Sequence, residues 1–142
     1  MRYVVGFMFD ESYNDVLMIR KTKPKWQAGL LNGVGGKIEP GEKELDAMKR
    51  EFLEEVGIQH DEWDCFLWYK VRSEHEILFY VASSDKVLEY RQMEEEKPLI
   101  INVDELKDYD HVSNLSFIVP LAKWFHQNRS YMKHPLSLQE SD

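Results

Sequence analysis

Three glutamates in the segment between Lys43 and Gly57 have a spacing that could perform chemistry. Glu51, Glu54 and Glu55 are three and four residues apart, so they would share one side of a helix. Converging carboxylates are the hard oxygen ligands that Mg²⁺ prefers, usually together with water and a substrate phosphate. An acidic solvent-exposed face explains the same spacing, because like-charge pairs on a helix surface cost only about 0.2 to 0.5 kcal/mol each.

The loop before these glutamates has an unusual composition. It reads GGKIEPGE and begins with the adjacent glycines Gly35 and Gly36. A glycine pair lets the backbone approach a ligand closely and leaves an unhindered carbonyl that could coordinate a cation. Loop and helix together form a plausible platform for a metal ion with a polyphosphate. On the residues alone, this interpretation and the acidic surface both remain open.

A helix is expected to position the glutamates. It should begin near Lys43, after a Pro-Gly turn, and end at Gly57, a residue suited to a helix C-terminus. Its apolar residues recur at helical spacing and should face the core on the side opposite the glutamates: Leu45, Met48, Phe52 and Val56.

The rest of the chain reads as strands followed by a second helix. Apolar runs rich in strand formers cover residues 3–10, 15–21, 63–71, 76–83 and 98–103, and the first two could form a hairpin. A helical pattern follows Asn114, bent or starting late because of Pro120, and the tail after Arg129 is expected to be loosely ordered. This order predicts an α/β fold with a mixed sheet and helices on its faces.

Length and composition limit the classes of function. The chain has 142 residues, the size of one domain spanning residues 1–142. A net charge of −8 argues against binding of a nucleic acid polymer. The single cysteine, Cys65, excludes an internal disulfide, and no apolar run is long enough to span a membrane. These features predict a cytoplasmic protein that acts on a small molecule without a membrane partner.

The loop and helix resemble the complete Nudix box. Gly36 is followed after five residues by Glu42 and after seven more by REFLEEVGI, which begins at Arg50. Phe52 is the one departure, at a position that usually holds an aliphatic residue. The resemblance implies the Nudix fold, an α/β/α sandwich with a mixed sheet and a loop–helix–loop that binds Mg²⁺ or Mn²⁺.

The resemblance also implies roles for individual residues. Glu54 and Glu55 would be metal ligands, and Glu51 a ligand or general base. The Gly35 carbonyl would be a further ligand, and Arg50 would orient the carboxylates through an ion pair with Glu51.

Two acidic positions outside the helix complete the implied machinery. Glu42 would hold the loop or the outer metal shell. The stretch MEEEKPL matches the region where the family supplies one more catalytic or metal-binding glutamate; Glu95 aligns best, with Glu94 and Glu96 as neighbouring alternatives. An exposed acidic turn is the competing interpretation.

The stretch LNGVGGKIEPGE also resembles the MutT-like enzymes that sanitise the nucleotide pool, particularly oxidised-purine triphosphatases. In those enzymes an asparagine before the glycine pair binds the purine edge, and Asn32 holds that position here. An amide offers both a donor and an acceptor, so it can bind a base at two points. A simple turn residue before Gly33 is the alternative.

Other candidate substrate contacts are less constrained. Asn114 lies where the resemblance places a base-contacting loop, although Asn114 and Leu115 replace a pair of aspartates and an N-cap role is equally open. Trp26 could stack on a base or cover the core. Lysines near the loop could contact the phosphates or remain on the surface: Lys37 first, then Lys23 and Lys25.

Together these features predict a Mg²⁺-dependent pyrophosphohydrolase. Its substrate would be a nucleoside triphosphate with a purine or an oxidised purine, such as 8-oxo-dGTP, and its products the nucleoside monophosphate and pyrophosphate. The rival enzyme prediction is a pyrophosphatase of ADP-ribose or another nucleoside-diphosphate sugar. A non-catalytic Nudix module that senses nucleotides is a third hypothesis. A monomer and a homodimer are equally compatible with the sequence.

Overall fold

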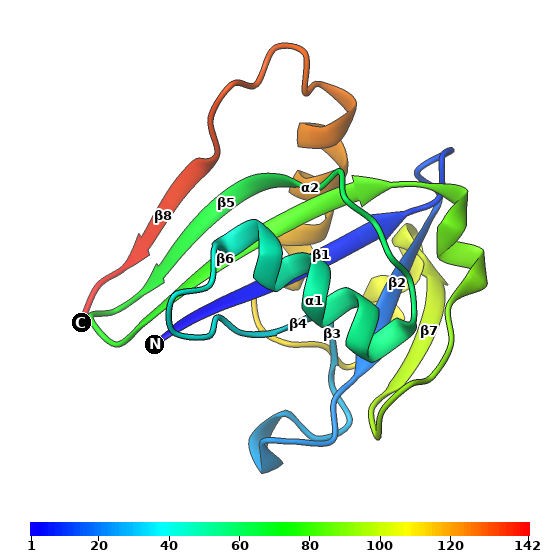
Figure 1. The fold of residues 1–142 in the computed structure, drawn as a ribbon, viewed down its shortest axis with the longest axis horizontal. Helices are drawn as coiled ribbons and strands as arrows, with labels where there is room; N and C mark the ends of the chain where they lie inside the picture. Colours follow the sequence, from blue (N-terminus) through cyan, green and yellow to red (C-terminus); the bar gives the residue numbers. More distant parts are fainter.

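A mixed sheet of eight strands lies between two helices (Figure 1). The computed structural model describes residues 1–142. The strands are β1 (Arg2–Phe9), β2 (Asp15–Arg20), β3 (Leu31–Asn32), β4 (Val34–Lys37), β5 (Asp64–Val71), β6 (His75–Ser83), β7 (Lys97–Asn102) and β8 (Leu136–Glu140). The α-helices are α1 (Glu44–Val56) and α2 (Leu115–Gln127), and short 3₁₀ helices cover Lys25–Gln27, Asp85–Glu89 and Val103–Asp108.

Strand β1 organises the centre of the sheet. The strand order is β3-β2-β1-β6-β5-β8, with β4 paired to β1 and β7 paired to β2. β1 runs parallel to β6, whereas β4 is antiparallel to its first half from Tyr3↔Lys37 to Gly6↔Val34. The expected hairpin is present, but β1 and β2 pair only at Phe9↔Val16. β4 and β2 therefore share one edge of β1, and the β3–β4 segment enters between them.

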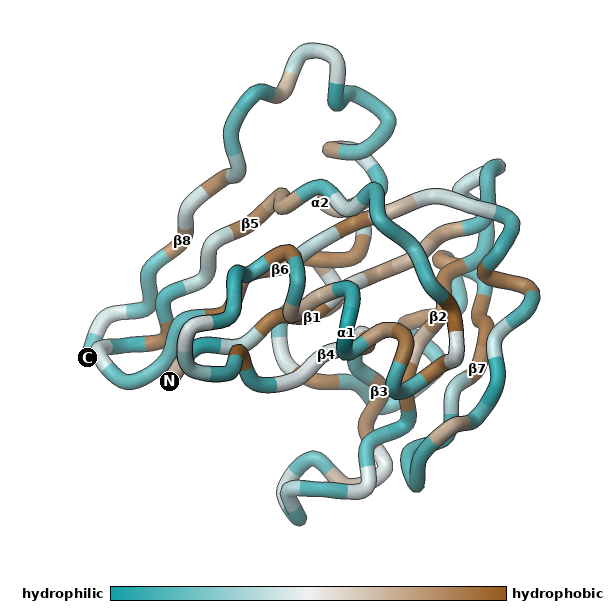
Figure 2. The backbone as a smooth tube through the Cα atoms, viewed as in Figure 1, coloured by the Kyte–Doolittle hydropathy of each residue, from teal (hydrophilic) through white to brown (hydrophobic).

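The two helices cover opposite faces of the sheet, each over its own hydrophobic cluster. The α1 face packs 15 buried residues, including Met48 and Phe52, and the α2 face packs 18, including Phe79 and Leu115. Hydrophobic residues concentrate in the central strands, and the long outer loops are hydrophilic (Figure 2). This arrangement confirms the predicted α/β/α sandwich and assigns Phe52 a packing role.

Both helices were predicted from the sequence, and the structure shows how closely their observed ends match the predicted ones. α1 ends as predicted: Gly57 adopts a left-handed conformation with φ 74° and donates its N–H to the Leu53 carbonyl at 3.0 Å. α2 starts at Leu115, ahead of Pro120, rather than late at the proline. Neither helix is long and apolar enough to cross a membrane.

The C-terminal tail differs from the expectation. Residues Leu136–Glu140 form strand β8, which pairs parallel to β5 from Leu67↔Leu136 to Val71↔Glu140. All five residues are exposed, so no buried apolar pattern marked this strand in the sequence. Its order comes from backbone hydrogen bonds to a strand more than sixty residues earlier, a pairing that local composition does not reveal.

Candidate functional site

Arg50 links the glycine loop to helix α1. Its guanidinium donates to both carboxylate oxygens of Glu42, from Nε at 2.7 Å and from Nη2 at 2.9 Å. Nη1 donates to Glu51 at 2.9 Å and to Glu54 at 3.3 Å, and Nη2 also reaches the Lys37 carbonyl at 3.1 Å. The planar, five-donor guanidinium suits this arrangement, which a lysine could not reproduce. Arg50 therefore fixes the direction of two helix carboxylates relative to the loop.

The glycine pair is required by close packing on both sides of β4. A Cβ on Gly36 would overlap the Glu51 carboxylate, and a Cβ on Gly35 would overlap the Val4 carbonyl of the neighbouring strand. Burial raises the pKa of Glu51 above its ordinary value, while the ion pair with Arg50 opposes that rise. The absence of a side chain at Gly36 lets this partly buried carboxylate lie directly against the strand.

Glu55 is the least expected member of the acidic group. Helical periodicity placed it on the exposed side, yet its residue is only 9% accessible. Burial, followed by the charge of Glu51, raises the pKa of Glu55 to about 8, and the positive charge of Lys21 opposes this rise. A buried carboxylate among other carboxylates is costly to ionise without a compensating cation.

The segment after the 3₁₀ helix Asp85–Glu89 covers the end of α1 and accounts for this burial. The Arg91 N–H donates to the Val56 carbonyl at 2.9 Å, and the Met93 N–H donates to the Glu55 carbonyl at 3.2 Å. The acidic run that follows is thereby brought beside the helix carboxylates.

Within residues 94–96, the structure favours the two neighbours of Glu95, rather than Glu95 itself, as the residues close to Glu55. Glu94 and Glu96 both contribute to the raised pKa of Glu55; Glu94 and Glu95 are exposed, and Glu96 is partly buried. Glu96 accepts from Lys21 Nζ at 2.9 Å and from the Thr22 N–H at 2.7 Å. Glu96 is thus committed to holding Lys21, and Glu94 is the member that faces the helix carboxylates without such a partner.

The donor set suits a hard divalent cation, although no three His, Cys, Asp or Glu side chains are positioned to hold a metal ion. Arg50 occupies the carboxylates of Glu51 and Glu54. The candidate ligands are all oxygen atoms, as Mg²⁺ and Mn²⁺ prefer. Burial, followed by the nearby charges of Glu51, Glu96 and Glu94, raises the pKa of Glu55, and a bound cation would offset this cost of ionisation. The residues fit a divalent ion on this chemistry.

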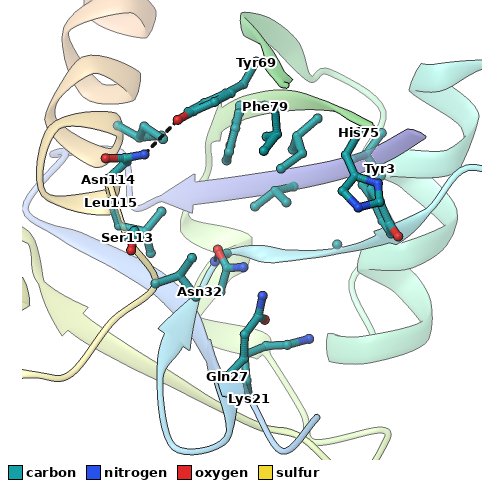
Figure 3. A pocket seen from close by; sticks show the side chains of 18 of the residues that line it. Tyr3, Lys21, Gln27, Asn32, Tyr69, His75, Phe79, Ser113, Asn114 and Leu115 are labelled. Carbon is teal, nitrogen blue, oxygen red and sulfur yellow. Dashed lines mark hydrogen bonds between the residues drawn. The ribbon is translucent and has the colours of Figure 1, made fainter. Parts of the chain in front are cut away.

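A cavity of about 510 Å³ lies on the α2 face of the sheet and extends to the glycine pair (Figure 3). Its walls include apolar residues from β5, β6 and α2, such as Phe79 and Leu115. Gly35, Gly36 and Lys21 line the end near the acidic group, while the helix carboxylates themselves do not line it. The cavity therefore has an apolar chamber and a polar end next to the glutamates.

Three of the predicted substrate contacts line this cavity. Trp26 is 73% exposed at its rim, so it does not cover the core. Asn32 accepts a hydrogen bond from the Gly33 N–H at 2.8 Å, as a turn residue would, and still has its amide NH₂ free. Asn114 precedes α2 but makes no side-chain cap; its Nδ2 donates to the Tyr69 hydroxyl at 2.9 Å.

The predicted lysines do not line the cavity, and other residues take that place. Lys37 contributes only its carbonyl to Arg50, and Lys23 and Lys25 lie outside the lining. Lys21 and Glu140 line the cavity and were not singled out in the sequence. Lys21 directly follows β2 and begins a loop that also contains Lys23 and Lys25, so only the fold distinguishes it from those two lysines.

Comparison with known proteins identifies the family. The NUDIX domain model matches residues 1–126, and no curated protein matches the chain. A structure from a study of MutT from Aliivibrio salmonicida and Vibrio cholerae has a TM-score of 0.73 at 22% identity, covering 87% of this chain and 98% of that one.

Two further solved structures share the fold. The NUDIX domain of Shewanella oneidensis NrtR, complexed with ADP ribose, has a TM-score of 0.73 at 13% identity and covers 87% of this chain and 86% of that one. A MutT protein from Bacillus halodurans has a TM-score of 0.63 at 18% identity, covering 99% of this chain and 90% of that one. With the family model matching most of its length and the box residues held together by Arg50, the chain belongs to the Nudix family and is a Nudix hydrolase.

Proposed function

We propose that this Nudix hydrolase cleaves a nucleoside triphosphate carrying a purine or an oxidised purine, releasing the nucleoside monophosphate and pyrophosphate. One observation carries the proposal: a single cavity runs from Asn32, Trp26 and Asn114 to the Gly35–Gly36 pair. Its apolar chamber has the character of a base site, and its polar end lies against the strand that supports Glu51. A nucleotide in this cavity would direct its phosphates toward the acidic group.

Nudix hydrolases generally use divalent metal ions such as Mg²⁺. We assign the ligands to Glu54 and Glu55 with the Gly35 carbonyl, with Glu51 as a further ligand or the general base, and an additional acidic contribution to Glu94. When bound, the ion supplies charge neutralisation on the phosphoryl oxygens and a lowered pKa for water.

The chain's own residues perform the remaining tasks. Arg50 holds Glu51 and Glu54 in fixed directions, because its guanidinium is in turn anchored by Glu42. Lys21, held by Glu96 at 2.9 Å, places a positive charge at the polar end of the cavity, where it can attract the phosphate chain. Glu51 is the candidate general base, since burial raises its pKa toward neutrality.

Base recognition is assigned to Asn32 and Trp26, which line the same cavity. The Asn32 Oδ1 atom accepts from the Gly33 N–H, which orients the amide, and its NH₂ group remains available as a donor. The exposed Trp26 ring at the rim offers a flat surface on which a base can stack. These contacts favour a planar, hydrogen-bonding group in the chamber, and they do not select a particular purine.

A substrate panel tests the proposal. We expect purine triphosphates to be hydrolysed with Mg²⁺ to monophosphate and pyrophosphate, and a chelator to abolish turnover. Glu54→Gln should reduce turnover at least ~10²-fold, since metal-borne stabilisation is worth several kcal/mol. The Glu54 side chain is about half exposed, so this substitution should leave the folding of the protein unchanged.

The panel also contains the outcomes that would contradict the proposal. Faster hydrolysis of ADP-ribose than of any triphosphate would indicate a nucleoside-diphosphate-sugar pyrophosphatase. Nucleotide binding without turnover of either class would indicate a sensing module. Full turnover in the presence of a chelator would refute the metal-dependent chemistry.

A further inference from the structure

The C-terminal strand β8 brings a carboxylate to the cavity from outside the family's common domain. The NUDIX domain model ends at residue 126, whereas β8 covers Leu136–Glu140. Glu140 nevertheless lines the same cavity as Asn32 and the glycine pair. The strand therefore contributes to the cavity in addition to extending the sheet.

The register of β8 explains how Glu140 comes to face the cavity. Paired residues of neighbouring strands lie on the same face, and successive residues alternate between faces. Tyr69 pairs with Leu138 and Val71 pairs with Glu140, so Glu140 shares the face of two cavity-lining residues. Gln139 pairs with Lys70 and lies on the opposite face.

A network of side-chain hydrogen bonds connects Glu140 of β8 to Asn114, the residue before α2, at the end of the cavity that Tyr69 lines. Asn114 Nδ2 donates to the Tyr69 hydroxyl oxygen at 2.9 Å, and that hydroxyl donates to Glu140 Oε2 at 3.2 Å. The other carboxylate oxygen, Oε1, has Arg72 Nε at 3.7 Å. Tyr69 is buried, whereas Asn114 and Glu140 are exposed. The core therefore holds the middle residue of this hydrogen-bond network in place.

The Glu140 carboxylate is the acceptor-only group at this end. A carboxylate carries about four lone-pair positions, and Tyr69 uses one of those on Glu140. The Asn114 amide donates one of its two N–H groups to Tyr69, which leaves its Oδ1 as an acceptor and its second N–H as a donor. Acceptors of this kind match a base edge that presents adjacent N–H donors. Guanine has such an edge in N1–H and the 2-amino group, whereas adenine places its one amino donor beside an acceptor nitrogen.

We propose that β8 is a base-recognition strand, and that Glu140 selects purines with a guanine-type donor edge over those with an adenine-type edge. This inference rests on the proposed function, because it takes the apolar chamber to be the base site. Glu140 is a specificity-determining residue, and Tyr69 and Asn114 position it.

Binding of monophosphates without metal tests this inference independently of hydrolysis. Titration calorimetry with dGMP and dAMP should show tighter binding of dGMP by the wild type. Glu140→Gln keeps an acceptor for Tyr69 but replaces one carboxylate oxygen with a donor. We expect its Kd for dGMP to rise roughly tenfold, as for loss of one base-edge contact, and its Kd for dAMP to change less than about threefold.

Two further variants separate recognition from stability. A chain truncated after His134 lacks β8 and should lose the preference for dGMP as Glu140→Gln does. Gln139→Ala, on the opposite face of the same strand, should retain it. Equal binding of dGMP and dAMP by the wild type, or an unchanged Kd ratio in Glu140→Gln, would overturn the inference. A retained preference for dGMP without any triphosphate turnover would count against the proposed function alone.

Discussion

Replacing the buried Glu55 by glutamine should stabilise the metal-free protein, increasingly so as the pH rises. The Glu55 residue is 9% accessible, and burial beside Glu51 raises its pKa from 4.5 to about 8. Below pH 4.5 the carboxyl group is neutral in both the folded and the unfolded chain. Between pH 4.5 and about 8 the unfolded chain releases this proton while the folded protein retains it, so the free energy of unfolding falls as the pH rises.

The pKa of Glu55 sets the size of the effect. A rise from 4.5 to about 8 corresponds to at most ~5 kcal/mol at about 1.36 kcal/mol per pKa unit. Relaxation and water penetration reduce such penalties in real proteins, so we expect a gain on the order of 2 kcal/mol for Glu55→Gln above pH 8. Near pH 5 the difference between the variant and the wild type should be small, because this pH lies only just above the unfolded-state pKa of 4.5 and little of the penalty has developed.

Urea unfolding in the presence of a chelator, at about pH 5 and about pH 8.5, measures this difference. Glu54→Gln is the matched control: it lies on the same helix with 48% of its side chain exposed, and should change stability by no more than ~0.5 kcal/mol at either pH. A Glu55→Gln variant no more stable than the wild type at the higher pH would refute the reasoning. So would a gain that does not grow with pH.

The remaining predictions concern the loop and the cavity. Gly36→Ala should lower turnover by about 10²-fold with little change in melting temperature, because the added methyl group displaces the Glu51 carboxylate; wild-type turnover would contradict this. Arg50→Lys should reduce the free energy of unfolding by ~1–3 kcal/mol, as denaturant titration would show, because an ammonium group cannot replace the bidentate contact with Glu42. Asn32→Ala should raise KM for the best purine triphosphate roughly tenfold to a hundredfold and affect a pyrimidine triphosphate far less. Equal losses for both bases in paired kinetics, with a lower melting temperature, would mean that Asn32 is only a turn residue.

The sequence predicted those parts of the fold that local patterns determine. The limits of α1 followed from its apolar stripe and from Gly57, which adopts the left-handed conformation expected of a helix end. The mixed sheet with helices on its faces followed from the order of strands and helices, and the α/β/α sandwich from the resemblance to the Nudix box. Strand β8 was missed because its five exposed residues carry no buried apolar pattern, and its partner β5 is distant in the chain.

Only the part of the candidate site that lies within the Nudix box could be predicted from the sequence. Arg50 contacts Glu51 as the resemblance implied, because both lie on one helix. The burial of Glu55 was not predictable from helical periodicity, since the segment containing Met93 covers it. Lys21 and Glu140 were missed for a related reason: each reaches the cavity through contacts with residues about seventy positions away.

The separation of the core into two clusters has a consequence for how this protein can evolve. Helix α1 and its carboxylates rest on one cluster, while the apolar chamber of the cavity rests on the other, across the sheet. Mutations that reshape the chamber can therefore accumulate without repacking the cluster beneath the carboxylates. The carboxylates and the cavity meet mainly at β4. Gly35 and Gly36 have no side chains there, and a larger residue at either position would overlap its neighbours. Such a division allows the choice of substrate to change while the hydrolytic centre stays the same.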